Sequence, residues 1–152
     1  MNSIRIEKKD IYTIEVNDNG DTIEFDLVDI ELPFKCDKAL NDVNKVYRDL
    51  QAKLVIIEKQ EDRRINGEIM TVNEKAKLEA HRTAFREMRV AMDAFLGEGA
   101  CQKIFGSRNY VEMYDDLFDQ LEPHFEKMKL NTKGITERIK AKYSKKNDGV
   151  LR

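Results

Sequence analysis

The side chains best suited to nucleophilic or metal chemistry are few in this chain and lie far apart. Its two cysteines are Cys36 and Cys101, and its two histidines are His81 and His124. A structural zinc site takes four such ligands, usually supplied as closely spaced pairs, and no such pair occurs. We therefore predict free cysteines in core or semi-buried positions, and a histidine at position 81 on a core-facing stripe. We expect no metal and no cofactor.

Acidic residues form one group that could attract a cation, at Asp115, Asp116, Asp119 and Glu122. They fall early in a helical pattern, where carboxylates are stabilised by the positive end of the helix dipole. We interpret them as ordinary helix-terminal residues. Residues 97–99 read Gly-Glu-Gly but lack the Lys-Ser/Thr of a phosphate-binding loop. The sequence thus favours a protein without catalytic residues over an enzyme.

Composition excludes further classes of function. The 152 residues have the length of one domain, and 27 basic against 29 acidic residues leave a net charge of -2. Such a balance provides no overall field for a nucleic acid. No apolar run approaches the roughly 18 residues of a membrane span, and the N-terminus has no signal-peptide pattern. We expect a soluble intracellular protein.

The N-terminal segment, residues 1–32, predicts a β-hairpin. Apolar and polar residues alternate on both sides of residues 17–21, whose Asn and Gly suit a tight turn. The alternation changes phase at Leu27 and Val28, which predicts a bulge or a new strand. Ile4 and Ile6 weakly indicate a third strand. Pro33 is expected to end the strand region.

Residues 33–143 predict a helical bundle. Apolar residues recur every three or four positions over 37–63, 71–96 and 111–128. Thr71 with Glu74 fits a capping box, Ser107 or Asn109 could cap the third helix, and Pro123 should kink or restart it. A short helix follows Gly134, and residues 144–152 are expected to form a disordered basic tail. The fold class is α+β, mostly α, with a hairpin before an antiparallel bundle of three long helices.

Three glycines, Gly97, Gly99 and Gly106, lie between the second and third long helices. We expect this joint to set how the helices meet, with Gly97 as a left-handed C-cap and residues 99–105 forming one or two helical turns. The apolar stripes and the bulky residues near the joint exceed what a thin bundle easily buries. Self-association or a protein partner is therefore expected.

The stretch Phe95-Leu-Gly-Glu-Gly-Ala-Cys-Gln-Lys-Ile-Phe-Gly106, followed by Asn109 and Leu121-Glu-Pro123, resembles small tail proteins of long-tailed bacteriophages and prophages, the tail assembly chaperones. The resemblance covers roughly residues 20–130. It implies a non-enzymatic protein of the bacterial host cytoplasm that binds the tape-measure protein and the tail-tube subunit. The candidate anchors are Phe105, Tyr110 and Tyr114. Two alternatives stay open: a minor tail or connector protein kept in the virion, and an adaptor that binds a host protein.

Overall fold

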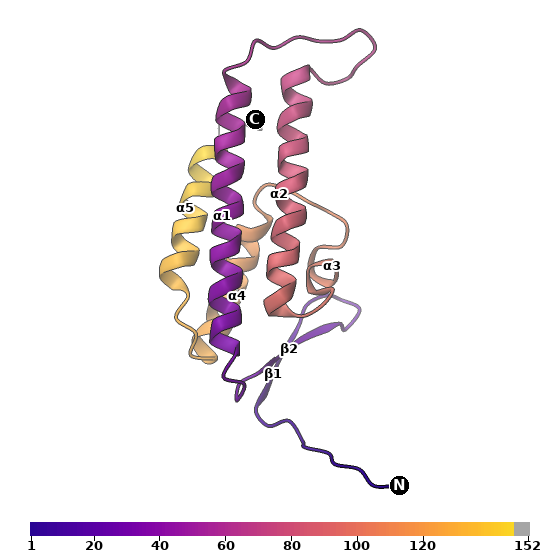
Figure 1. Ribbon diagram of the computed structural model, residues 1–152, viewed down its shortest axis with the longest axis vertical. Helices are drawn as coiled ribbons and strands as arrows, with labels where there is room; N and C mark the ends of the chain where they lie inside the picture. The colour runs from indigo at the N-terminus through magenta and orange to yellow at the C-terminus, as the bar shows by residue number, and fades with distance from the viewer. Residues whose placement is uncertain (148–152) are drawn as a thin grey trace.

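The computed structural model shows an N-terminal β-hairpin followed by helices (Figure 1). It describes residues 1–147, with side chains described through residue 140. The predicted class, mostly α with a small sheet, is confirmed. Only the first two helices are long, however, because the helix predicted as the third long one has 15 residues, as does the last described helix.

The hairpin consists of β1 (Ile11–Glu15) and β2 (Thr22–Asp26), paired antiparallel. Tyr12 lies opposite Phe25 and Ile14 lies opposite Ile23, so these four side chains share one face. That face is the buried or half-buried one. The predicted turn closes the hairpin, since the side-chain oxygen of Asn17 accepts two backbone N–H groups within it.

Residues 27–31 form turns, so the predicted bulge or second strand is wrong. The carboxylate of Asp26 accepts a hydrogen bond from the backbone N–H of Val28, and that of Asp29 accepts one from Glu31. Such aspartate turns compete with strand pairing. The apolar alternation here was therefore not a strand signal, and Ile4 and Ile6 likewise form no strand and are exposed.

The first helix, α1 (Leu32–Glu58), begins and ends about five residues earlier than predicted. Pro33 lies in its first turn, where a missing N–H costs nothing, so this proline starts a helix instead of ending a strand. At the other end, the Asn73 amide donates to the carbonyls of Ile57 and Gln60, at 3.2 and 2.9 Å. This contact from the next helix stops α1 early.

The second helix, α2 (Val72–Leu96), lies antiparallel beside α1 (Figure 1). Its N-cap is Thr71, whose hydroxyl accepts from the backbone N–H of Glu74 at 3.1 Å, as predicted. Asp62 in the connecting loop accepts from the Asn73 N–H, and this hydrogen bond holds the pKa of its carboxyl below the usual range. The loop is thus tied to the start of α2.

Three shorter helices complete the chain: α3 (Ala100–Phe105), α4 (Met113–Lys127) and α5 (Lys133–Asn147). Helix α4 runs through Pro123 without a break, and its N-cap, Glu112, makes no side-chain cap, so neither Ser107 nor Asn109 caps it. Helix α5 includes Gly134 and continues over residues 144–147, which the sequence had assigned to the tail. The rest of that tail lies outside the described residues.

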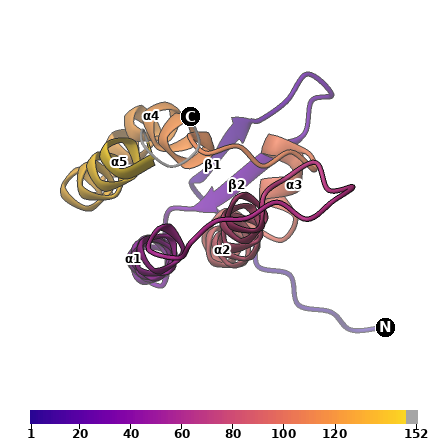
Figure 2. The ribbon, with the colours of Figure 1, turned by 90° about the horizontal axis from the view of Figure 1, so that it is seen from above.

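The core lies between the α1–α2 pair and α4, with the hairpin closing one end (Figure 2). Ring contacts join the layers: Phe85 of α2 lies 6.5 Å from Tyr114, and Phe95 of α2 lies 5.9 Å from Phe125. Helix α5 packs along α1 and α4 and buries Ile139. The Phe25 ring of β2 lies 5.3 Å from the Phe95 ring in the last turn of α2, so the hairpin lies beneath that end of α2.

Alanine substitutions at two glycines can distinguish the effect of backbone strain from that of helix propensity. Gly106 has φ +66° and ψ -148°, a region nearly exclusive to glycine, whereas Gly134 lies in α5 without a positive φ and with open space at its Cβ position. We expect Gly106→Ala to lower the free energy of unfolding by about 1–3 kcal/mol. The matched Gly134→Ala should raise it by about 0.5 kcal/mol.

Urea unfolding followed by circular dichroism measures both changes. Equal effects of the two substitutions would contradict the assignment of strain to the joint.

Candidate functional site

The three predicted joint glycines all adopt positive φ angles. Gly97 ends α2 with φ 118° and ψ 154°, Gly99 precedes α3 with φ 74°, and Gly106 follows α3 with φ 66°. The left-handed helical conformation expected at Gly97 is found at Gly99 instead. Together the three residues reverse the chain twice, which places the six-residue α3 against the side of α2.

Polar contacts fasten α3 to α2. The carboxylate of Asp93 accepts from the backbone N–H of Cys101 at 2.8 Å, and the Cys101 thiol donates to the carbonyl of Arg89 at 3.8 Å. From the hairpin side, the Asn17 amide donates to the carbonyl of Lys103 at 3.0 Å. The short helix is therefore held from both α2 and the hairpin turn.

The three predicted anchors form one aromatic cluster. The Phe105 ring lies 6.5 Å from that of Tyr110 and 5.7 Å from that of Tyr114, both edge-on. Phe105 and Tyr110 are half-buried, whereas Tyr114 is 1% exposed. Burial raises the pKa of Tyr114, and its hydroxyl has no hydrogen-bond partner among the described residues. Tyr114 thus supports Phe105 from beneath and is not itself on the surface.

Two arginines frame this cluster, and sequence reasoning had not singled them out. The Arg89 guanidinium lies 5.8 Å from the Phe105 ring centre, and that of Arg108 lies 4.9 Å from the Tyr110 ring centre. Arg89 also donates to the side chain of Asn109 at 3.1 Å and to the carbonyl of Arg108 at 2.8 Å. The loop before α4 is thereby fixed over α2. The sequence of α2 itself gives no signal that the loop before α4 contacts Arg89.

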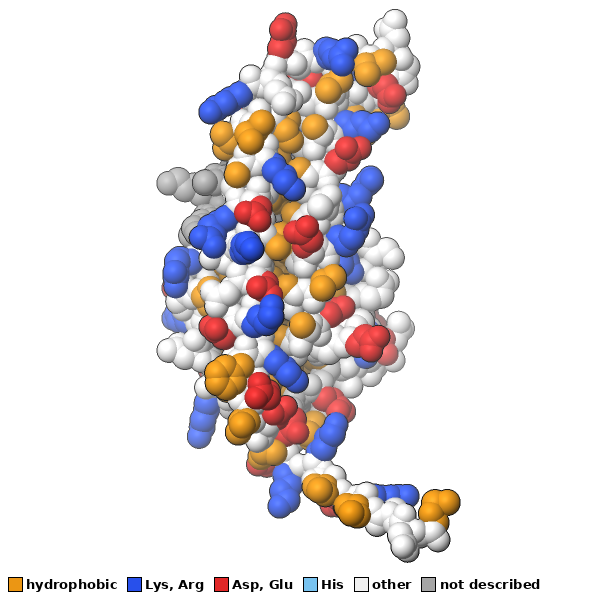
Figure 3. All heavy atoms as spheres, viewed as in Figure 1, with side chains coloured by type: hydrophobic (Ala, Val, Ile, Leu, Met, Phe, Trp, Pro, Cys, Tyr) orange, Lys and Arg blue, Asp and Glu red, His pale blue; other side chains and the backbone are white. Residues whose placement is uncertain are grey.

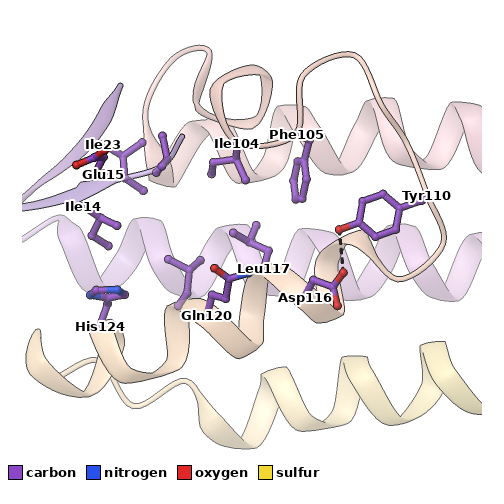
Figure 4. A pocket seen from close by; sticks show the side chains of 12 residues that line it. Ile14, Glu15, Ile23, Ile104, Phe105, Tyr110, Asp116, Leu117, Gln120 and His124 are labelled. Atoms are coloured by element: carbon purple, nitrogen blue, oxygen red, sulfur yellow. Dashed lines mark hydrogen bonds between the residues drawn. The ribbon is translucent and has the colours of Figure 1, made fainter. Parts of the chain in front are cut away.

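A cavity of about 270 Å³ opens between the hairpin, α3 and α4 (Figure 4). We call it the hairpin pocket. Its apolar walls come from both strands, from α3 and from α4, and its polar lining is Glu15, Asp116, Gln120 and His124. The volume lies just below the roughly 300–1,000 Å³ of small-molecule sites. It suits one or two side chains of a partner.

Hydrogen bonds define the two ends of the hairpin pocket. Tyr110 donates its hydroxyl to Asp116 at 2.8 Å, visible at one end of Figure 4, and burial together with this bond raises the pKa of Tyr110. At the other end, the Tyr12 hydroxyl and His124 Nδ1 are hydrogen-bonded at 2.7 Å. One of the four acidic residues noted in the sequence, Asp116, thus orients Tyr110 at the rim of the pocket by accepting its hydrogen bond.

The other chemically notable residues are spread through the fold. Asp119 pairs with Lys140 of α5, which raises the pKa of that lysine. His81 is buried, with Nδ1 2.9 Å from the Lys77 carbonyl. Within the described part of the chain, no three Asp, Glu, His or Cys side chains gather as a metal site would require. None of its described helices combines the length and apolarity that a membrane crossing needs.

A model of a protein family of unknown function, DUF6673, matches residues 19–148. The chain belongs to this family. The family match begins inside the hairpin turn and covers β2 and all the described helices. The three joint glycines and the helices on either side of them therefore lie within the matched region. No curated protein and no solved structure matches the chain.

Both cysteines of this DUF6673 member are free and buried, as predicted. Burial, assisted by a neighbouring aspartate, raises the pKa of Cys36 and of Cys101 to about 12. At pH 8 we expect the folded protein to react with a disulfide reagent at least about a thousandfold more slowly than the urea-unfolded chain, because the thiolate is the reactive form. Thiol titration with and without urea measures this. Rapid reaction of the folded chain would contradict the burial of the two thiols.

Proposed function

We propose that this chain is a non-enzymatic phage or prophage protein of tail morphogenesis, a tail assembly chaperone that binds the tape-measure protein in the bacterial host cytoplasm. The observation that carries the proposal is the half-buried pair Phe105 and Tyr110 beside the hairpin pocket. Aromatic side chains next to a small cavity are typical of protein-binding hot spots. The resemblance of residues 95–106 to tail assembly chaperones supports the choice of partner.

The shape of the site favours a helical client. Phe105 and Tyr110 stand at the rim, and the buried Tyr114 ring contacts Phe105 from beneath. An amphipathic helix binds such a surface by inserting residues from one face, spaced three or four apart, into a groove. A tape-measure protein with long helical segments would provide faces of this kind, which aggregate if left uncovered.

Co-expression with the neighbouring phage reading frames, followed by affinity capture and light scattering, tests the function. Capture of the tape-measure protein supports it, and the measured mass gives the stoichiometry, including any homo-oligomer. Presence of the chain in purified virions would favour a minor tail or connector protein. Capture of a host protein alone would favour an adaptor.

We expect Phe105→Ala and Tyr110→Ala each to weaken capture of the tape-measure protein by about tenfold or more, since truncating an aromatic anchor removes much of the binding energy. Phe34→Ala provides a matched control, because Phe34 is 67% exposed but lies at the start of α1, outside the aromatic cluster. Pull-down with quantified bound fraction measures all three.

Tyr114 needs a gentler substitution, because Tyr114→Ala removes a core ring and should cost about 3–5 kcal/mol of stability. Tyr114→Phe keeps the ring and should bind the client normally. Normal binding by folded Phe105→Ala and Tyr110→Ala proteins would refute the assignment of the site.

A further inference from the structure

Three arginines lie on one face of α2. Arg82, Arg86 and Arg89 are spaced four and then three residues apart, which brings them onto one side of a helix over about 10 Å. Arg108 is next to Arg89, since its carbonyl accepts a hydrogen bond from Arg89 and its guanidinium lies over the Tyr110 ring. We call these four residues the arginine row. Figure 3 shows basic side chains gathered along the edge of α2 away from α1.

The outer half of the arginine row consists of Arg82 and Arg86. Arg82 and Arg86 are exposed, and neither belongs to an ion pair of the described residues. By contrast, Lys77 on another face of the same helix pairs with Glu58 at 2.9 Å. Like charges three and four residues apart repel one another and lower helix stability. An anionic partner would relieve that repulsion.

The inner half of the row is already oriented. Arg89 lies against Phe105, and Arg108 lies against Tyr110, so both guanidinium groups are held next to the aromatic rim. An ordered guanidinium loses less side-chain freedom when it binds a carboxylate, and it can do so through two parallel hydrogen bonds. A charged partner bound to the arginine row would therefore lie next to Phe105 and Tyr110.

We propose that the arginine row binds the acidic face of a partner helix whose apolar face packs on Phe105 and Tyr110. This inference rests on the proposed function for the location of the anchors and adds the chemistry of the bound segment. The segment carries carboxylates spaced four and three residues apart, matching Arg82, Arg86 and Arg89, beside apolar residues.

The charge pattern around the row favours a peptide over a nucleic acid. Glu79 precedes Arg82 by three residues, is exposed and therefore lies beside it on the helix surface. A continuous phosphate backbone would meet this carboxylate, whereas a helix can place its own acidic residues only opposite the arginines. The net charge of -2 gives no wider attraction for a polyanion.

The probe is a synthetic amphipathic helical peptide with three glutamates spaced four and three residues apart, compared with the same peptide carrying glutamines. We expect the folded full chain to bind the glutamate peptide about tenfold more tightly at low salt, with the preference fading at high salt. The Arg82→Glu/Arg86→Glu protein should lose the preference. Fluorescence anisotropy measures the dissociation constants.

The matched control is Lys45→Glu/Arg48→Glu, which makes the same change in net charge at exposed positions of α1. This control protein should keep the preference. Equal affinity for both peptides, no binding by the unaltered chain, or loss of preference in the control would each overturn the inference. Tighter binding of a labelled single-stranded oligonucleotide at the same row would also overturn it, in favour of nucleic acid.

The same variants separate this inference from the proposed function. If the unaltered chain binds both peptides equally and the Arg82→Glu/Arg86→Glu protein still captures the tape-measure protein normally, the acidic-partner inference fails and the function stands. If the preference is present but no tail protein is captured, the inference stands and the function fails.

Discussion

The ring contacts of Phe95 with Phe25 and Phe125 join two elements that are each too small to be stable alone, the hairpin and α4, to the end of α2. The ring centres lie 5.3 and 5.9 Å apart, and all three side chains are buried. A two-stranded hairpin is marginal in water, and an isolated helix of 15 residues is hardly better. Because Phe95 lies in the last turn of α2, it holds both against the stable α1–α2 pair. This contact helps to hold the walls of the hairpin pocket together.

The position of the aromatic cluster follows from backbone geometry more than from side-chain attraction. Gly99 and Gly106 bound α3 with positive φ angles, so the chain leaves α2, turns back along it and presents Phe105 beside Tyr110. Arg89 then fixes the returning loop through the Arg108 carbonyl. The glycines set the path of the chain, and the arginine holds that path in one conformation.

Structural features that are set by residues close together in the sequence could be predicted from it. The hairpin turn follows from residues 17–21, and the start of α2 follows from Thr71. The end of α1 was missed because Asn73 caps it from the next helix, and a capping contact of that kind leaves no trace in the sequence near residue 58. In the candidate site, Phe105 and Tyr110 could be found as bulky residues near glycines. The burial of Tyr114 and the role of Arg89 arise from long-range packing, which periodicity does not encode.

The strand wall of the hairpin pocket is held partly by hydrogen bonds between side chains and the helices, unlike the walls formed by the helices themselves. Away from the Phe25 contact, the hairpin edge is tied to the helices by the Tyr12–His124 and Asn17–Lys103 hydrogen bonds. Water can replace such bonds at a net cost of about 1 kcal/mol each. We infer that the strand wall opens at a lower free energy than the helical frame unfolds. Such an opening would widen the pocket for a bulky side chain while the rest of the fold stays closed.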